Sequence, residues 1–298
     1  MGTDAKPFLK WAGGKGQLLS QLAEHLPKQI REKPFTYVEP FVGGGAMLFY
    51  MLQHSGNIRK AVINDVNEDL ILTYRTIRDE VETLIGVLSQ MEREYLAIDS
   101  QEERSIRFYE IREQYNQHRG DGITRSAQLI FLNKTCFNGL YRVNGKGRFN
   151  VPFGRYANPV ICNASLLRAD SQLLQQTNIE ICHGDYARTI EHVEGLTFVY
   201  LDPPYRPLNA TSSFTAYAKG DFNDDSQRRL ADFCRRLSER GCYWMESNAD
   251  CSAENPEDTF FEELYADCRI ERVKATRSIN ANASKRGKLT ELLIRNYE

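Results

Sequence analysis

The feature that most restricts the fold of this chain is a series of short, β-rich apolar segments separated by longer intervals. Segments of this kind are typical of strands that are buried on both faces. They are Tyr37–Phe41, Ala61–Ile63, Ile179–Cys182, Phe198–Leu201, Cys242–Met245 and Leu289–Ile294. Helical patterns lie in several of the intervals, and this alternation favours an α/β fold with a mainly parallel sheet.

Two of these helical patterns have recognisable limits. The first has an apolar face that Pro27 ends, made of Leu18, Leu19, Leu22, Ala23 and Leu26. The second follows Asp224 or Asp225, either of which is a candidate N-cap. Its apolar face is made of Leu230, Phe233 and Leu237. We expect a helix in each interval.

From about residue 70 to residue 160 the alternation breaks, because polar helices and one hairpin dominate. The hairpin is predicted over Val143–Phe149, where Asn144-Gly145 suits the positive φ values of a tight turn between extended arms. We interpret 70–160 as an inserted, mostly helical module. Residues 1–69 and 161–298 then form the domain that carries the sheet.

The net charge of −2 is unusual for a chain that binds nucleic acid, but the charges are unevenly distributed. Acidic residues crowd into 80–103, 221–225 and 254–263. Between Thr135 and Tyr156 there is no acid, and this stretch contains Arg142, Lys146, Arg148 and Arg155. A second stretch without acids contains Lys274, Arg277, Lys285, Arg286 and Lys288. Each stretch alone fits a solvated surface, whereas the two together favour a polyanionic partner modestly.

Cysteine usage and hydropathy indicate the compartment. The seven cysteines form no C-x-x-C pair, and we interpret them as reduced thiols, with neither a disulfide framework nor a metal site. No stretch approaches the roughly 20 apolar residues that a membrane span needs. The N-terminus also lacks an apolar run after Lys6 and Lys10. We therefore expect a soluble, cytoplasmic protein that does not enter a membrane.

A glycine-rich turn follows the first apolar segment. Glu39-Pro40-Phe41-Val42-Gly43-Gly44-Gly45 precedes a helical run, so its backbone could approach a ligand closely and point helix N-terminal amides at it. The motif alone is weak, because Leu48 replaces the third glycine of a dinucleotide fingerprint. Asp65 follows the next segment, where an acid can accept hydrogen bonds from ribose hydroxyls or can cap a helix. The loop and the acid together favour an adenosine-containing cofactor, either NAD or S-adenosylmethionine.

The most informative motif is Asp202-Pro203-Pro204-Tyr205, directly after the segment Phe198–Leu201. The two prolines fix the backbone and leave carbonyls available as acceptors. The Asp202 carboxylate and the Pro203 carbonyl can then accept hydrogen bonds from an exocyclic amine, while Tyr205 offers a ring for base stacking. Such a site holds an amine so that its nitrogen lone pair points at a sulfonium methyl group. An isolated match would be a structural turn, but this one ends a strand and follows a cofactor loop.

With these motifs the chain resembles the Dam-type DNA adenine methyltransferases and their relatives in restriction-modification systems. The resemblance covers most of the length. It is carried by 8–15 (FLKWAGGK), the Gly43 loop, Asp65, 138–142 (NGLYR), 149–156 (FNVPFGRY), 202–205 (DPPY) and 214–217 (FTAY). It implies a Rossmann-like sheet that binds S-adenosylmethionine, and an inserted module, with its β-hairpin, that recognises target DNA.

The resemblance also implies roles for individual residues. Those expected in catalysis are Asp202, Pro203 and Tyr205. Those expected at the cofactor are Trp11, Lys15, Glu39, Phe41, Gly43, Gly45, Asp65, Asp185 and Asp202. Those expected at DNA are Lys10, Phe137, Asn138, Leu140, Arg142, Lys146, Pro152, Arg155 and Tyr156. In the family, positions that match Lys10 and Arg142 contact guanines, which fits bidentate pairing of arginine with guanine O6 and N7.

These expectations lead to methylation of adenine N6 in double-stranded DNA, within GATC, on a base flipped out of the helix. A monomer is expected, and a cognate restriction endonuclease is a candidate partner. Related amino-methyltransferases that act on cytosine N4, RNA or protein glutamine are the nearest alternative. A catalytically silent DNA-binding module is another, and an NAD oxidoreductase would leave 202–205 without a role. The family pattern is least well matched over 92–119, so a preference for flanking sequence stays open.

Overall fold

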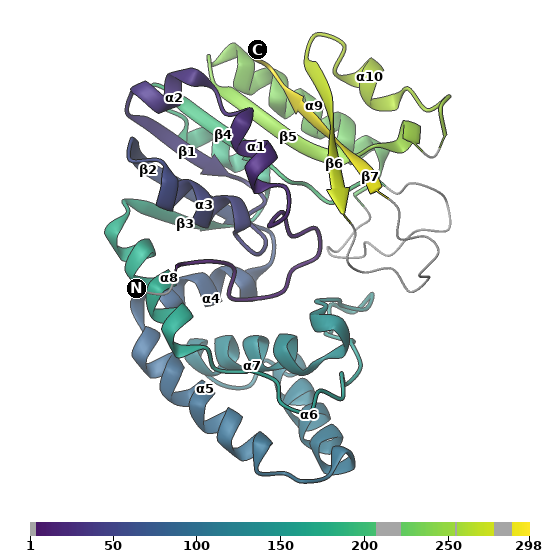
Figure 1. Ribbon diagram of the computed structural model, residues 1–298. Helices are drawn as coiled ribbons and strands as arrows, with labels where there is room; N and C mark the ends of the chain where they lie inside the picture. The colour runs from purple at the N-terminus through teal and green to yellow at the C-terminus, as the bar shows by residue number, and fades with distance from the viewer. Residues whose placement is uncertain (1–3, 207–221, 254, 277–287) are drawn as a thin grey trace.

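The structure is a computed structural model that describes residues 4–206, 222–253, 255–276 and 288–298. It contains a seven-stranded sheet with the strand order β3-β2-β1-β4-β5-β7-β6 (Figure 1). The strands are β1 (Phe35–Glu39), β2 (Ile58–Asp65), β3 (Ile179–His183), β4 (Thr197–Leu201), β5 (Tyr243–Ala249), β6 (Arg269–Thr276) and β7 (Lys288–Arg295). The pairs from β3 to β5 are parallel, and β7 runs antiparallel to both β5 and β6. The expected α/β fold with a mainly parallel sheet is confirmed.

Helices lie on both sides of the sheet and extend well beyond it. The α-helices are α1 (Leu19–Glu24), α2 (Lys28–Glu32), α3 (Ala46–His54), α4 (Glu68–Asp79), α5 (Val81–Leu96), α6 (Gln101–Asn116), α7 (Gly122–Thr135), α8 (Ala164–Gln176), α9 (Asp224–Glu239) and α10 (Phe260–Leu264). Short 3-10 helices are η1 (Phe137–Gly139), η2 (Tyr186–His192) and η3 (Cys251–Ala253).

Two apolar clusters pack on opposite faces of the sheet, because successive side chains of a strand point to opposite faces. Tyr37 and Phe198 belong to the cluster that includes residues of α1, α3, α4 and α8. Their neighbours Val38 and Val199 belong to the cluster that includes residues of η2, α9 and α10. Burial on both faces explains why the central strands read as continuous apolar segments.

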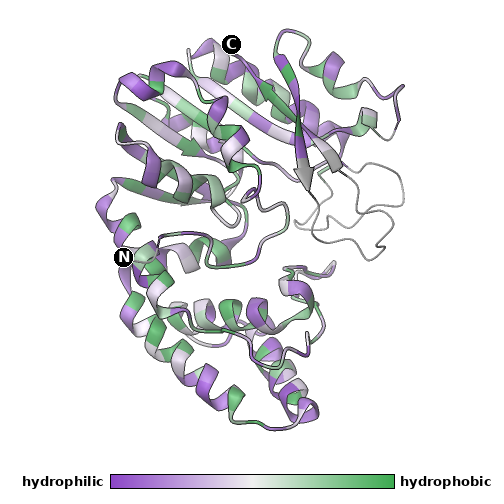
Figure 2. Cartoon of the chain, in the orientation of Figure 1, coloured by the Kyte–Doolittle hydropathy of each residue, from purple (hydrophilic) through white to green (hydrophobic). Residues whose placement is uncertain are grey.

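The helices α5, α6 and α7 form the half of the molecule away from the sheet (Figure 1). Their buried residues, such as Leu88, Phe108 and Leu129, belong to the same cluster as Tyr37 on the sheet, with α4 and α8 between them. Figure 2 shows apolar and polar residues alternating along these helices, as expected where only one face of a helix is buried. The helical half therefore rests on the core of the sheet half.

Three local expectations are corrected. The strand β6 was not predicted, because its sequence alternates charged with apolar residues instead of forming an apolar segment. The N-cap of α9 is Asn223, whose side chain accepts from the Ser226 amide, so Asp224 and Asp225 lie in the first turn.

The third correction concerns the hairpin, which forms with Val143 bridged to Phe149. Its positive φ of 73° is at Gly147 and not at the Asn144-Gly145 pair. The Gly147 amide donates to the Asn144 carbonyl at 2.8 Å. The Asn144 side chain accepts from the amides of Lys146 and Arg148, at 3.0 and 3.1 Å, and so caps the turn from within.

Among the described residues, no helix is both long and apolar enough to cross a membrane. The motif 214–217, Arg277, Lys285 and Arg286 lie outside the described residues.

Candidate functional site

Several predicted site residues stand where parallel strands end. Glu39 ends β1, Asp65 ends β2 and Asp202 directly follows β4. Because β1 lies between β2 and β4, the carboxyl ends of these strands meet along one edge of the sheet. In open α/β sheets ligands bind at this edge, where crossover connections diverge.

The glycine turn after β1 is held by Asp65. The Gly43 amide donates to Asp65 Oδ2 at 3.1 Å, and the Asn67 amide donates to Asp65 Oδ1 at 2.9 Å. Burial raises the pKa of Asp65 above its usual value. Each carboxylate oxygen has two lone-pair sites, so both oxygens can accept a further hydrogen bond from a ribose hydroxyl. Asp65 therefore fastens the loop and can still bind a ligand.

The loop can bend in this way because two of its glycines have positive φ, 46° at Gly43 and 76° at Gly45. A side chain at Gly43 would come within 2.9 Å of the Trp11 ring, which shows how closely the indole packs on the loop backbone. A side chain at Gly45 would collide with the Tyr74 hydroxyl. These two glycines meet both a conformational and a spatial requirement.

Trp11 connects the loop with the helical half. Its indole stacks on the Tyr141 ring, with 4.9 Å between centroids and 21° between planes. The Tyr141 hydroxyl lies within hydrogen-bonding reach of Asn67 and Tyr115. The segment that carries Trp11 runs between the two halves of the molecule (Figure 1). Tyr141 belongs to the motif 138–142 but was given no role from the sequence, because its contact with Trp11 depends on the fold.

The carboxylate of Asp202 lies in a cluster with Lys15, Tyr205 and Glu291. Lys15 is 3% exposed, and its ammonium lies 3.0 Å from Asp202 Oδ1 and 3.4 Å from Glu291 Oε2. Lys15 also donates to the Tyr205 hydroxyl, which donates to Glu291 Oε2 at 2.6 Å. Two carboxylates thus surround one buried ammonium. Glu291, on β7, was not predicted.

Burial raises the pKa of Asp202 to about 6, although the Lys15 ammonium beside it works in the opposite direction and favours the ionised form. The negative charge of Glu291 raises this pKa further. Asp202 is therefore mostly ionised at neutral pH. It can accept a hydrogen bond there, and its charge is sensitive to small changes in the cluster.

Glu39 is a buried acid at the same edge. The Tyr37 hydroxyl donates to Glu39 Oε2 at 2.7 Å. Burial raises the pKa of Glu39 well above its usual value, and the charge of Asp202 raises it too. Because the charge of Asp202 raises the pKa of Glu39, the two carboxyl groups lie in one site of low dielectric constant.

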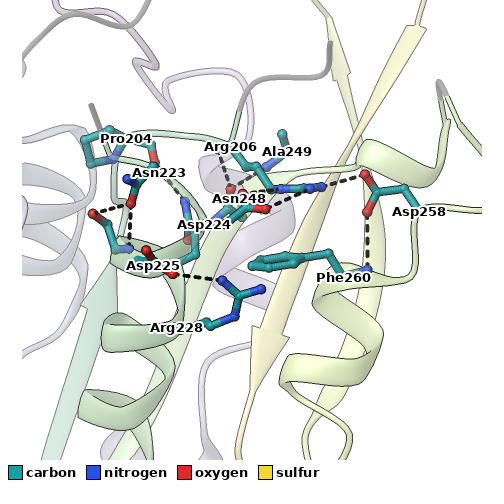
Figure 3. A network of polar contacts seen from close by, with 12 residues as sticks. Pro204, Arg206, Asn223, Asp224, Asp225, Arg228, Asn248, Ala249, Asp258 and Phe260 are labelled. Carbon is teal, nitrogen blue, oxygen red and sulfur yellow. Dashed lines mark hydrogen bonds and ion pairs between the residues drawn. The ribbon is translucent and has the colours of Figure 1, made fainter. Parts of the chain in front are cut away.

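The backbone of 202–205 is supported from behind. Gln227 on α9 donates to the Pro204 carbonyl at 3.2 Å and accepts from Asn248 at 3.1 Å. The next residue, Arg206, donates through Nε to Asp224 at 2.8 Å and through Nη1 to Asp258 at 2.6 Å (Figure 3). These contacts tie the end of the motif to α9 and to the segment before α10.

Asp185 stands after β3, and its carboxylate is already engaged. Arg229 on α9 binds both oxygens, at 2.8 and 2.9 Å, and the Ala187 amide donates to Oδ1 at 2.9 Å. The Arg229 guanidinium accordingly holds the pKa of Asp185 below its usual value. Nearby, the rings of Phe41 and Tyr186 lie 4.9 Å apart. A ligand at Asp185 must share this carboxylate with Arg229.

The residues expected at DNA lie within residues 137–156, except Lys10, whose side chain packs against Gly139 and Tyr156. Phe137 is 51% exposed. Asn138 and Arg155 are exposed too, and both have positive φ, 57° and 55°. Pro152 is also exposed, and its carbonyl accepts from the Phe137 amide at 2.8 Å. Leu140 is half-buried beside them.

The hairpin presents its cations in different ways. Arg142 at its base donates through Nε to Asn150 Oδ1 at 2.8 Å. Arg148 forms an ion pair with Glu113 of α6 at 2.7 Å, so it fastens the hairpin to the helical half. Lys146 lies exposed in the turn. Arg142 and Lys146 therefore retain a positive charge that no acid neutralises within the described residues.

One further group could hold a metal ion by composition. Glu180, Cys182 and His192 offer ligand atoms within 4.8 Å of one another on β3 and η2. Lys60 already lies 3.0 Å from Glu180 Oε2 and compensates its charge. In the part of the chain that the structure describes, no other such group occurs. We assign no metal role to this group.

The chain is similar to known DNA methyltransferases over most of its length. A family model described as "D12 class N6 adenine-specific DNA methyltransferase" matches residues 11–279. The chain is 50% identical over 298 residues to the type II methyltransferase M.MjaIII of Methanocaldococcus jannaschii, covering 99% of this chain and 100% of that one. It is 39% identical to the type II methyltransferase M1.LlaDCHI of Lactococcus lactis, covering 98% and 95%. It is 33% identical to the DNA adenine methylase of Escherichia coli K12, covering 97% and 94%.

Proposed function

The chain belongs to the D12 class of N6 adenine-specific DNA methyltransferases, and from that premise we propose that it transfers a methyl group from S-adenosylmethionine to an adenine flipped out of a GATC site. We assign the chemistry to residues 1–69 and 161–298 and the reading of DNA to residues 70–160. Lys10 lies in residues 1–69, but we assign it to the reading of DNA as well. The nearest alternatives, transfer to cytosine N4 or to RNA, are not favoured by any contact described above.

The observation that carries the proposal is the meeting of the glycine loop and the 202–205 motif on neighbouring strands. The loop follows β1 and the motif follows β4, and these strands pair directly. Trp11 packs on the loop, and Lys15 contacts Asp202 of the motif. Both residues come from one segment of the chain. A cofactor bound along the loop would therefore lie beside Asp202.

When bound, S-adenosylmethionine supplies an electrophilic methyl group on a sulfonium. The residues of the chain orient the two reactants, since this direct displacement depends on positioning and on the electrostatics around the moving charge. We assign the ribose hydroxyls to Asp65 and the loop contact to Gly43 and Trp11. Glu39, buried at the end of β1, directly precedes the same loop.

For the amine, we assign one oxygen of Asp202. Lys15 contacts Oδ1, which leaves Oδ2 to accept a hydrogen bond from the exocyclic amine of adenine. The Pro203 carbonyl is the second acceptor that we assign. Tyr205 would then pack on the base while its hydroxyl stays anchored to Glu291. With its hydrogens bound in this way, the amine would keep its nitrogen lone pair free to accept the methyl group, and it would then release one proton to solvent.

For DNA, we assign guanine contacts to Lys10 and Arg142 and backbone contacts to Lys146, Arg155 and Tyr156. Phe137, Asn138, Leu140 and Pro152 would lie at the space that the flipped base leaves. Support comes from the exposure of this surface and from cations that keep their charge. We further propose action as a monomer on double-stranded DNA, because one chain supplies every part of the site. The names of two relatives favour a restriction endonuclease with the same target as a partner.

Digestion of DNA from expressing cells tests the proposal directly. One endonuclease that cuts only unmethylated GATC and one that cuts only methylated GATC should give opposite patterns. DNA from cells that express Asp202→Ala should behave as unmethylated DNA. Methylation by the wild-type chain at another sequence would overturn the GATC assignment, and 4-methylcytosine in the hydrolysed DNA would overturn the choice of adenine.

A further inference from the structure

Asn133 is a buried amide on α7 that binds two separate segments of the chain. It is 1% exposed. Its Oδ1 accepts from the Lys10 amide at 2.9 Å, and its Nδ2 donates to the Lys10 carbonyl at 2.8 Å. The same Nδ2 donates to the Gly139 carbonyl at 2.9 Å. One side chain thus binds both polar groups of the Lys10 backbone and one group of the loop 137–140.

The loop and Lys10 are also packed closely together. Gly139 has a positive φ of 64°, and a side chain there would come within 2.5 Å of Lys10 Cδ. The aliphatic part of Lys10 therefore crosses the glycine directly. At its far end, the Lys10 ammonium lies 5.9 Å from the centre of the Tyr156 ring. The direction of the Lys10 side chain is set by its backbone, by Gly139 and by Tyr156.

We propose that Asn133 is a positioning residue for base recognition, which sets the place of Lys10 relative to the loop 137–140. This inference rests on the function proposed above, in which Lys10 reads a guanine. Asn133 does not itself touch DNA in this arrangement, because it is buried beneath both segments. Its side-chain amide is neutral and contacts the backbone of Lys10. The positive charge of the Lys10 ammonium therefore stays available for the base. Lys10 and the loop then approach the DNA as one unit.

Hydrogen-bond discrimination between bases depends on accurate placement of the donor, whereas attraction to phosphate tolerates displacement. Loss of the Asn133 contacts should therefore reduce the preference for the cognate base pair more than it reduces binding to DNA in general. We expect the ratio of methylation rates on GATC and on oligonucleotides substituted at the Lys10-read guanine to fall by about tenfold, the size of about 1.4 kcal/mol.

The test is this rate ratio for Asn133→Asp, Lys10→Ala and the double variant. An aspartate at position 133 can still accept from the Lys10 amide, but it cannot donate to the carbonyls of Lys10 and Gly139. If Asn133 acts through Lys10, the double variant should discriminate no worse than Lys10→Ala alone, because coupled residues are not additive. Because the ratio compares two substrates of one enzyme preparation, a partly unfolded variant still gives a valid result. Asn133→Ala serves as a second variant should Asp at this buried position prevent folding.

Thr135→Val is the matched control. Thr135 is fully buried on the same helix, and its hydroxyl donates to the Phe131 carbonyl one turn earlier in that helix. Its ratio should stay at the wild-type value even where its stability falls. If Lys10→Ala discriminates less well but Asn133→Asp and Asn133→Ala discriminate as the wild type does, the role of Asn133 is overturned and that of Lys10 is kept. Unchanged discrimination in Lys10→Ala would instead overturn the assignment of Lys10 in the proposed function.

Discussion

The proposed catalytic cluster (Lys15, Asp202, Tyr205 and Glu291) and the proposed recognition surface (Lys10 and residues 137–156) both contain cations, but the partners of these cations differ in charge. Lys15 is buried against the carboxylates of Asp202 and Glu291. On the recognition surface, Arg142 is held by the amide of Asn150, and Lys10 by Asn133 through its backbone. Carboxylates neutralise a buried ammonium, which would otherwise be costly. Neutral amides position a cation and leave its charge available for a nucleic acid.

The exception on the recognition surface supports this distinction. Arg148 is paired with Glu113 and is the hairpin cation with an acidic partner among the described residues. Its partner lies on α6, so the ion pair fastens the hairpin instead of presenting a charge. Under the function proposed above, the charge of the partner thus separates the cations that build the site from the cations that read DNA.

The strongest test of the charged cluster is Asp202→Ala. Methyl transfer should fall by on the order of 10³-fold, since the lost carboxylate orients the amine at the reacting centre. DNA affinity should change little, because phosphate contacts elsewhere supply most of it. Single-turnover rates and a DNA titration measure the two effects separately. Wild-type turnover by this variant would remove Asp202 from the reaction.

On the recognition surface the largest effect is expected for Arg142→Ala. Cognate binding should weaken by about 1 to 3 kcal/mol, which is roughly 5- to 150-fold, while unrelated DNA should bind almost as before. Rates on GATC and on each single-base variant measure this loss of discrimination. A uniform fall with unaltered ratios would show that Arg142 contacts only the DNA backbone.

Lys146→Ala is the control for that experiment, because Lys146 lies exposed in the hairpin turn. Loss of a phosphate contact should weaken cognate and unrelated DNA about equally and lower the salt slope by about one. Changed base preference in this variant would contradict its assignment to the backbone.

Asp65→Ala tests the cofactor loop. Binding of S-adenosylmethionine should weaken by about 1 to 3 kcal/mol, because a charged acceptor is lost and the Gly43 amide is released. Asp65→Asn should lose less, since its amide oxygen can still accept from Gly43. Calorimetric titration gives both dissociation constants. A lower melting temperature with unchanged cofactor affinity would limit Asp65 to holding the loop.

The smallest effect is expected for Glu291→Gln. The rate should fall as the pH drops through the pKa of Asp202, about 6, because a protonated carboxyl is a weaker acceptor for the amine than a carboxylate. The negative charge of Glu291 raises that pKa, so its removal should lower the pKa and move the acid limb to lower pH, by less than about one unit. The pH profile of single-turnover rates measures the shift. An unmoved limb would show that Glu291 only anchors Tyr205.

The positions of the central strands could be predicted because burial on both faces makes them continuously apolar. The edge strand β6 could not, since Arg269, Glu271 and Arg272 break its apolar pattern. The glycine loop, Asp65 and the 202–205 motif were recognisable because each has a fixed place after a strand. In the structure each of the three does follow a strand, and the fold brings them together along one edge of the sheet.

Partners brought together only by the fold could not be predicted. Glu291 is one acid among many in the sequence, and nothing local marks it as the neighbour of Lys15. Asn133 lies in an apolar stretch of α7, where a single amide gives no periodic signal. The roles of both follow from distances between segments that are far apart in the chain. The individual roles of the site residues stay predictions until the variants above are measured.

The pairing of Lys15 with Glu291 also determines when the catalytic cluster can form during synthesis. Lys15 leaves the ribosome early, while Glu291 is added only after nearly all other elements, in a strand that inserts between β5 and β6. The contact is of very long range, and such contacts form late because a large loop must close first. A nascent chain arrested before β7 should therefore carry Lys15 and Asp202 but lack Glu291, the second carboxylate of the catalytic cluster. Enzymatic competence would then arrive in one step, as β7 enters the sheet.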